Sequence, residues 1–133
     1  MFIQDNIVGT FNLLEAARKF EQLELFYYFS TDEVFGPSDK DTKFQEWDRY
    51  NSKNPYAATK AAGEELTIAF SNTYSIPSLI SHCCNVYGER QHSEKFIPNT
   101  IKKILNDEKV IIHTDENNVP VSYTHLTLPT IPG

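Results

Sequence analysis

Asn54-Pro55-Tyr56-Ala57-Ala58-Thr59-Lys60 is the stretch on which the interpretation of the whole sequence rests. Asn54 is a favourable helix cap, and Pro55 suits the first helical position because its missing N–H is not needed there. Tyr56 and Lys60 then lie four residues apart, on one face of the helix. A neighbouring ammonium favours phenolate, so the pair predicts a tyrosine that acts as a base nearer neutral pH. On spacing alone, most such pairs are ordinary helix surface, so a catalytic interpretation of Tyr56 and Lys60 depends on the surrounding sequence.

Helix-like and strand-like patterns alternate on both sides of that stretch. Apolar residues at helical spacing predict amphipathic helices, and short apolar runs predict buried strands. In chain order we expect helix 3–20, strand 25–29, helix 55–74, strand 78–84, helix 95–106 and strand 109–113. This alternation predicts an α/β fold with a parallel sheet and crossover helices. The polar loop 36–53, anchored by Trp47 and Tyr50, has the length of loops that carry function.

The first two helices have predicted inward faces of apolar residues. Small alanines in the second helix permit close packing against a sheet or a partner helix. The expected inward residues are Ile3, Ile7, Phe11, Leu14 and Ala17 in the first helix, and Ala57, Ala61, Leu66, Ala69 and Phe70 in the second.

Bulk composition limits the class of protein. The 133 residues are enough for one domain, and 40% hydrophobic with 23% charged residues is typical of a globular protein. A net charge of −6 without a basic stripe argues against a nucleic-acid partner. No apolar run approaches the roughly 20 residues of a membrane span. The neighbours Cys83 and Cys84 are a poor framework for a disulfide, so a reducing, cytoplasmic setting is expected.

Polar side chains follow the predicted strands at their carboxyl ends, where open α/β sheets bind ligands. Ser30-Thr31-Asp32-Glu33 comes directly after the first strand, and Asn85-Val86-Tyr87-Gly88 follows the second. Two adjacent acids are usually a solvated strand end, because Asp and Glu are mostly exposed. His82, Cys83, Cys84, His92 and His113 match no common zinc spacing, so no metal site is expected.

Five blocks together resemble the extended short-chain dehydrogenase/reductase family, and within it the dTDP-glucose 4,6-dehydratases. They occur in the family's order and cover most of residues 2–113. The blocks are DNIVGT (5–10), STDEVFG (30–36), NPYAATK (54–60), NVYG (85–88) and EKFIP (94–98).

The resemblance also implies that parts of the family's domain are missing. Its glycine-rich turn and first strand lie upstream of DNIVGT in relatives, and its substrate lobe lies downstream. We therefore expect residues 1–120 to be an internal fragment of an NAD-dependent epimerase/dehydratase domain, a partial Rossmann-like doubly wound fold. The last stretch, 121–133, resembles a translated sequencing adapter and is excluded from fold reasoning. Without the glycine-rich turn, which holds the pyrophosphate, the chain alone is expected to bind NAD weakly or not at all.

For the intact enzyme, the resemblance implies transient oxidation of a sugar nucleotide by tightly held NAD. Tyr56 would take the 4-hydroxyl proton, and Lys60 would lower the tyrosine pKa and bond the nicotinamide ribose. Glu33 would remove the C5 proton, Asp32 would protonate the departing 6-hydroxyl, and Thr31 would hydrogen-bond the 4-oxygen. The remaining implied contacts are Ser30 with the cofactor, and Asn85, Lys95 and Phe96 with the nucleotide-diphosphate sugar.

Val86 stands where the family has a second Asn associated with the cofactor. The implied roles of Asn6 and Thr10 are to position the first helix beside the cofactor rather than to perform chemistry.

Two other functions stay open at this point. A sugar-nucleotide epimerase or decarboxylase of the same fold needs only the Tyr/Lys pair, so the vicinal acids Asp32 and Glu33 favour dehydration. Alternatively, the chain is a non-catalytic or inert fragment. In full-length relatives the helices corresponding to 3–20 and 55–74 often form a dimer seam, so a homodimer is expected.

Overall fold

The computed structural model describes residues 1–38, 41 and 43–112, and these fall into two compact units. The first unit, Met1–Val86, contains the strands and the first helices. The second begins at Tyr87 and contains a single helix within its described part. No helix among the described residues is long and apolar enough to cross a membrane. The adapter-like stretch 121–133 and His113 lie outside the described residues.

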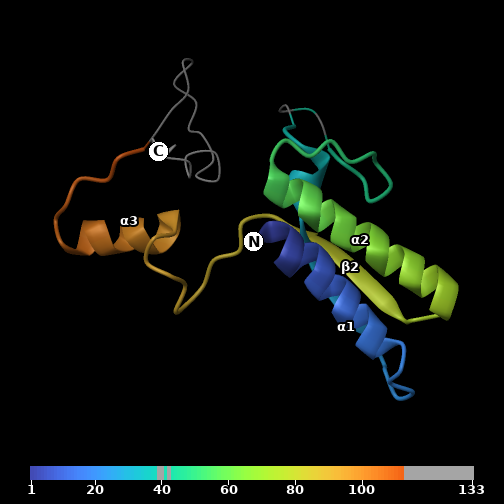
Figure 1. The fold of residues 1–133 in the computed structure, drawn as a ribbon. Helices are drawn as coiled ribbons and strands as arrows, with labels where there is room; N and C mark the ends of the chain where they lie inside the picture. Colours follow the sequence, from blue (N-terminus) through green and yellow to red (C-terminus); the bar gives the residue numbers. More distant parts are fainter. Residues whose placement is uncertain (39–40, 42, 113–133) are drawn as a thin grey trace. The chain divides into compact units, whose positions relative to one another are not determined.

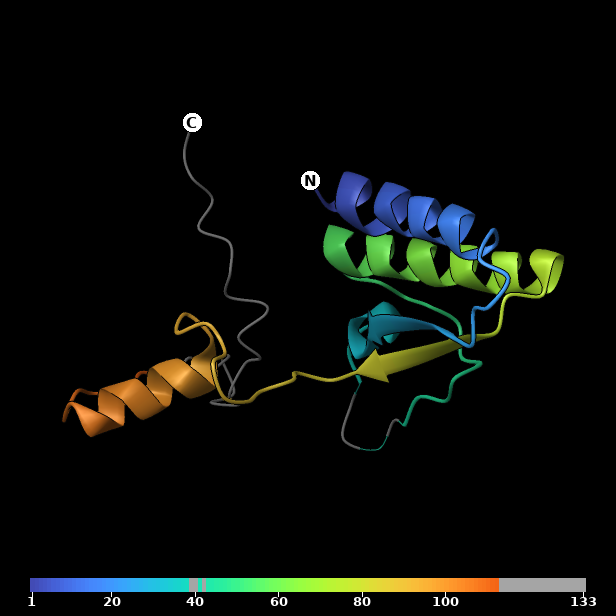
Figure 2. The same ribbon diagram turned by 90° about the horizontal axis from the view of Figure 1, so that it is seen from below.

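Two parallel strands and a helical layer make up the first unit (Figure 1). Helices η1 and α1 run consecutively, α2 connects the strands, and both helical segments cover the same face of the sheet (Figure 2). Parallel neighbours joined by a crossover helix confirm the predicted α/β architecture. The elements are η1 Ile3–Val8, α1 Gly9–Ala17, β1 Phe26–Thr31, η2 Asp32–Phe35, α2 Pro55–Tyr74 and β2 Ser78–Cys83.

The register of the two strands places polar residues of β1 and β2 side by side at their carboxyl ends. β1 pairs with β2 from Phe26 opposite Ser78 to Thr31 opposite Cys83, which sets Ser30 opposite His82. Alternation along β1 buries Tyr28 and Ser30, whereas Tyr27 and Phe29 stay exposed. The expectation of a buried strand at 25–29 is therefore correct for one face of β1 only, since among the described residues the helical layer covers a single face of the sheet. The strand also begins one residue later and extends two residues further than predicted.

A small apolar core joins the helices to the sheet. Leu14, Phe70 and Ile76 are buried together, and Phe26 packs against them. The predicted inward faces are only partly correct. Leu14, Ala57 and Phe70 are buried, but Ile3, Phe11 and Ala69 are exposed. The polar residues Thr59, Glu64 and Thr67 instead lie buried on α2, where each has a hydrogen-bond partner: Asn6, Ser30 and the Gly63 carbonyl respectively.

Gly63 permits the close approach of α2 to β1 and η1. A Cβ at this position would lie 2.1 Å from Tyr28 Oη and 3.2 Å from the Asn6 carbonyl oxygen. In the full-length protein that contains this sequence, Gly63→Ala should lower the free energy of unfolding by about 1–3 kcal/mol through overpacking. Urea denaturation measures this effect. Gly88→Ala is the control, because a Cβ there meets nothing within 4 Å. Equal unfolding midpoints for both variants would contradict the packing role.

The described residues of the predicted long loop, 36–38, 41 and 43–53, lie outside the helices and strands as expected, but one of the two expected anchors is wrong. Trp47 is 79% exposed, which does not suit an anchor, whereas Tyr50 Oη donates a hydrogen bond to Glu64 Oε2. Phe44 is the second anchor, because its ring stacks on Phe35 with centroids 5.3 Å apart.

The second unit contains α3, Phe96–Leu105, close to the predicted helix. The strand expected at 109–113 is not formed in its described part, 109–112, which is irregular. A short apolar run needs a neighbouring strand to complete its hydrogen bonds, and no partner strand pairs with it among the described residues.

Candidate active site at the carboxyl end of the first strand

The carboxyl end of β1 turns directly into η2, which presents the two acids. Thr31 is the N-cap of η2, and its Oγ1 accepts a hydrogen bond of 3.3 Å from the Glu33 backbone N–H. The same hydroxyl donates to Asp32 Oδ1 over 3.3 Å. Thr31 is buried and Asp32 is exposed, so the turn places a hydroxyl and a carboxylate at the edge of the sheet.

Asn54 joins this turn to the start of α2. Its Oδ1 accepts a 2.8 Å hydrogen bond from the Ala57 N–H, the cap that the sequence predicted. Its Nδ2 donates to Glu33 Oε2 over 2.7 Å. One amide side chain therefore fixes both the helix that carries Tyr56 and the carboxylate of Glu33. Glu33 is thus held beside the N-cap of α2, where the positive end of the helix dipole favours a carboxylate.

Lys60 lies half-buried against the backbone of β1. Its Nζ donates a 2.6 Å hydrogen bond to the Phe29 carbonyl and lies 4.3 Å from the centre of the Tyr28 ring. Tyr28 Oη donates to the Lys60 carbonyl over 3.3 Å. Lys60 is therefore held at the same strand end as Thr31. Tyr56 lies one turn earlier on α2, where its ring packs edge-on against Phe2.

The electrostatic environment of this pair differs from the expected one. Burial raises the pKa of Tyr56, and the Glu33 carboxylate raises it further. Burial lowers the pKa of Lys60, and the Glu64 carboxylate opposes that change. The expectation that Lys60 makes Tyr56 acidic is thus not met in this structure, because the Lys60 ammonium is bonded to the Phe29 carbonyl.

The first helical segment is tied to α2 close to this pair. Asn6 Nδ2 donates to Thr59 Oγ1 over 3.0 Å, and Thr10 Oγ1 donates to the Asn6 carbonyl over 2.7 Å. Thr59 Oγ1 donates in turn to the Tyr56 carbonyl over 2.8 Å. Asn6 therefore links η1 to α2, whereas the Thr10 hydroxyl bonds within its own helical segment; their placement beside the cofactor stays a prediction.

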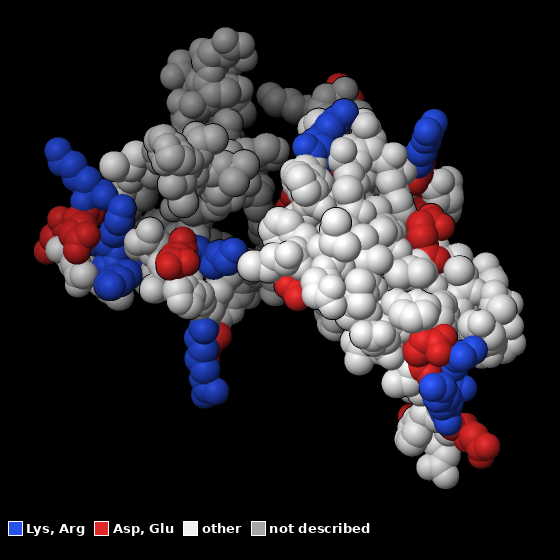
Figure 3. Space-filling model, in the orientation of Figure 1, with Lys and Arg blue, Asp and Glu red and all other residues white. Residues whose placement is uncertain are grey.

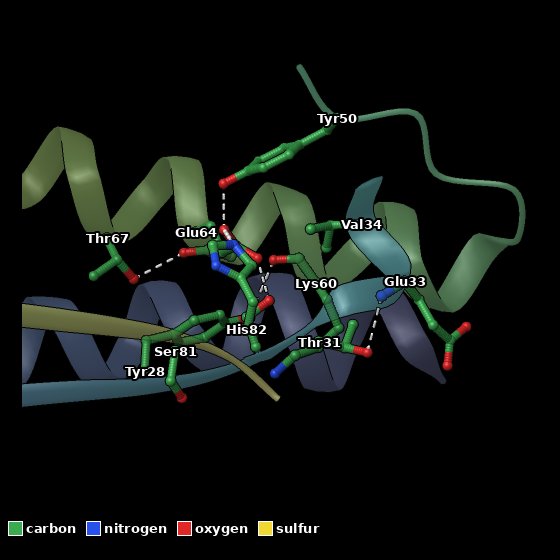
Figure 4. A network of polar contacts seen from close by, with 12 residues as sticks. Tyr28, Thr31, Glu33, Val34, Tyr50, Lys60, Glu64, Thr67, Ser81 and His82 are labelled. Carbon is green, nitrogen blue, oxygen red and sulfur yellow. Dashed lines mark hydrogen bonds and ion pairs between the residues drawn. The ribbon is translucent and has the colours of Figure 1, made fainter. Parts of the chain in front are cut away.

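Sequence reasoning missed Glu64, which is fully buried beneath the candidate site (Figure 4). Its Oε1 accepts from Ser30 Oγ, and its Oε2 accepts from Tyr50 Oη and from His82 Nε2 at 2.9 Å. Burial and the Glu64 carboxylate raise the pKa of Tyr50. The available signal was the i, i+4 spacing from Lys60, which places both residues on one helix face.

The other predicted residues take different places. Asn85 is exposed just beyond β2, and Cys84 lies near Asp32, whose carboxylate raises the pKa of the thiol. Lys95 and Phe96 belong to the second unit, at the start of α3. Within the described ranges, no three His, Cys, Asp or Glu side chains gather as a metal site would require.

Comparison with known proteins places these observations in a family. The profile of the NAD dependent epimerase/dehydratase family matches residues 1–120. A dTDP-glucose 4,6-dehydratase of Neisseria gonorrhoeae is 43% identical over 123 residues, covering 86% of this chain and 36% of the relative. The chain thus spans about a third of the length of such relatives.

Solved structures resemble the chain in both fold and sequence. The dTDP-glucose 4,6-dehydratase of Bacillus anthracis, crystallised with NAD, superposes with a TM-score of 0.76 at 34% identity, over 83% of this chain and 35% of that one. A UDP-glucuronic acid 4-epimerase of Bacillus cereus, in complex with UDP-glucuronic acid and NAD, has a TM-score of 0.76 at 31% identity. That match covers 85% of this chain and 35% of the epimerase. Both reactions therefore occur on this scaffold.

Proposed function

The chain belongs to the NAD dependent epimerase/dehydratase family, and we propose that the full-length protein containing it is a sugar-nucleotide 4,6-dehydratase. The proposed reaction converts a dTDP-glucose-type substrate to its 4-keto-6-deoxy product. One observation carries the proposal: Asn54 joins the turn that holds Asp32 and Glu33 to the helix that holds Tyr56 and Lys60. Elimination of water needs an acid and a base at one sugar, whereas epimerisation needs only the redox pair.

The residues present suit NAD as the cofactor. A half-buried ammonium and a phenol project from one helix beside the carboxyl end of a parallel strand, where this fold binds dinucleotides. Lys60 and Tyr56 would hold the nicotinamide ribose through hydrogen bonds to its hydroxyls. When bound, NAD accepts a hydride from the sugar C4 and later returns it to C6.

The first chemical task of the side chains is removal of a hydroxyl proton. Tyr56, as phenolate, takes the proton of the sugar 4-hydroxyl, and Thr31 hydrogen-bonds the same oxygen and fixes its position. Loss of hydride from C4 then leaves a ketone. Burial and the Glu33 carboxylate raise the pKa of Tyr56 in this structure, and the Lys60 ammonium, once bonded to the cofactor ribose beside Tyr56, would act in the opposite direction.

The second task is elimination across C5 and C6. The 4-ketone acidifies the C5 proton, which Glu33 removes from its position beside Asn54. Asp32 donates a proton to the departing 6-hydroxyl, so that water leaves and a C5–C6 double bond forms. Hydride addition at C6 and protonation at C5 complete the 4-keto-6-deoxy sugar. In the elimination step, Glu33 accepts a proton and Asp32 donates one.

The remaining proposed contacts are with the nucleotide-diphosphate sugar. Asn85 lies just beyond β2, the neighbouring strand end, where its amide would hydrogen-bond the substrate. Lys95 would pair with a phosphate of the diphosphate, and Phe96 would contact the nucleotide arm. These assignments rest on family resemblance.

Product analysis tests the proposal. The NAD-loaded full-length protein, incubated with dTDP-glucose, should give a product whose proton NMR spectrum contains a new C6 methyl signal. A dehydratase consumes the 6-hydroxyl, so the methyl signal should grow as the substrate C6 methylene signals fall. Epimerisation would leave those methylene signals in place, and decarboxylation would require a uronic acid substrate. Either of those products would replace the dehydratase proposal.

A second copy of the chain is the proposed partner of the first unit. The surface over α1 and α2 is largely uncharged (Figure 3). Large apolar side chains are exposed on these helical segments, which favours an apolar seam between two subunits. The exposed residues are Phe2, Ile3, Phe11, Leu13 and Ile68. A monomeric sedimentation coefficient for the full-length protein would contradict the proposed dimer.

The inert alternative applies to the 133-residue chain by itself. The chain spans about a third of the length of its relatives. Absence of NAD binding by the isolated chain would support this alternative for the chain alone, without bearing on the full-length protein.

A further inference from the structure

Glu64 is a buried carboxylate that the proposed chemistry does not use. Its side chain has no exposed surface, although burying a charge without partners is costly. Three donors surround it: hydroxyls of Ser30 and Tyr50, and the Nε2 of His82. An ionised carboxylate is an acceptor only, and all three groups can donate to it when His82 carries a proton on Nε2.

The donors come from three different segments beside the candidate site. Ser30 lies on β1, His82 is its register partner on β2, and Tyr50 lies in the loop before α2. Figure 4 shows Tyr50 and His82 pointing toward Glu64 from two of these elements. Ser30 directly precedes Thr31, and Glu64 follows Lys60 by one helical turn. The Glu64 carboxylate therefore links the carboxyl end of β1 to α2, the helix that carries Tyr56 and Lys60.

We propose that Glu64 is a positioning residue of the active site, which fixes the carboxyl end of β1 against α2 and supplies the negative charge that supports the Lys60 ammonium. This inference rests on the proposed function for its catalytic consequence, but not for its electrostatic one. Burial lowers the pKa of Lys60, and the Glu64 carboxylate raises it. Removing the charge should therefore lower the pKa of Lys60 further.

Glu64→Gln is the sharpest test, because it removes the charge and keeps the size. The amide can donate to Ser30 Oγ and accept from Tyr50 and His82, so the fold should persist. Lys60 is titrated by NMR in the full-length protein with 13C-labelled lysine Cε, assigned with Lys60→Arg. We expect its pKa to fall in Glu64→Gln and the alkaline limb of the kcat profile to move to lower pH. Glu65→Gln, the exposed neighbour on α2, should change neither.

Ser30→Ala tests the positioning role separately. It removes the hydroxyl that links β1 to Glu64 and leaves the carboxylate in place. The affinity for NAD is measured beside kcat, because the family resemblance also implies a contact between Ser30 and the cofactor. We expect kcat to fall about tenfold with little change in KM or in the pKa of Lys60, because Thr31 loses its support. Wild-type kcat in Ser30→Ala would overturn the positioning role even if Glu64→Gln failed to fold.

The two proposals fail in different ways. An unchanged pKa of Lys60 in folded Glu64→Gln would overturn the electrostatic role of Glu64, whatever the enzyme's activity. A full-length protein that makes no 4-keto-6-deoxy product, yet shows the lower pKa in Glu64→Gln, would overturn the proposed function and support the inference about Glu64.

Discussion

Tyr56→Phe should lower the kcat of the full-length protein by about 10³-fold and leave its fold intact. General base catalysis contributes roughly 10²–10⁴-fold to enzyme rates, and the phenolic hydroxyl is the only group that the substitution removes. The ring packs edge-on against Phe2, and phenylalanine keeps that contact. The thermal unfolding midpoint should therefore stay close to that of the wild type. Steady-state turnover of dTDP-glucose and a melting curve measure the two effects.

Tyr74→Phe is the matched control for this variant. Tyr74 lies on the same helix, is 47% exposed and packs against Phe70. Its variant should keep both turnover and stability. If Tyr56→Phe retained kcat within a few-fold of wild type, the first proton transfer would need another base, and the proposed mechanism would be wrong.

The local sequence around Asn54 predicted its structure well, because its signals act over short distances. A cap, an N1 proline and apolar spacing determine where α2 begins, and Asn54 does cap it. The alternation of helices and strands predicted the parallel pairing of β1 with β2. Each of these features depends on residues that are close in the chain or on a general rule of topology.

Long-range contacts explain what sequence reasoning missed. The partners of Glu64 come from up to 34 residues away, and only the fold brings Ser30 to it. The same limit applies to Lys60, whose ammonium bonds to the backbone of Phe29, 31 residues earlier. Exposure of Phe29 likewise depends on what covers each sheet face, which alternation of residue types along β1 does not specify.

Glu33→Gln should stop the reaction after the sugar has been oxidised. Glutamine keeps the size of the side chain and accepts from Asn54 through its oxygen, but it does not remove the C5 proton. Absorbance of the reduced cofactor should rise on mixing with dTDP-glucose and persist, and product formation should fall by about 10²–10⁴-fold. Stopped-flow absorbance measures the first effect, and the C6 methyl signal measures the second.

The pH dependence of this half-reaction provides a second readout. The Glu33 carboxylate raises the pKa of Tyr56, after the larger effect of burial. Removing that negative charge should lower the pKa, so more phenolate is present at a given pH. The acid limb of sugar oxidation should consequently move to lower pH in Glu33→Gln. An acid limb at the wild-type position would show that Glu33 does not act on Tyr56.

Asp32→Asn separates the roles of the two acids. Product formation should fall in both Asp32→Asn and Glu33→Gln. Proton removal from C5 should persist in Asp32→Asn, because Glu33 is still present. In D₂O, the substrate recovered from Asp32→Asn should therefore carry deuterium at C5, and that from Glu33→Gln should not. Glu33 lies beside Asn54 at the start of α2, whereas Asp32 is held by the Thr31 hydroxyl at the exposed edge. The inverse deuterium pattern would exchange the two assignments and make Asp32 the base.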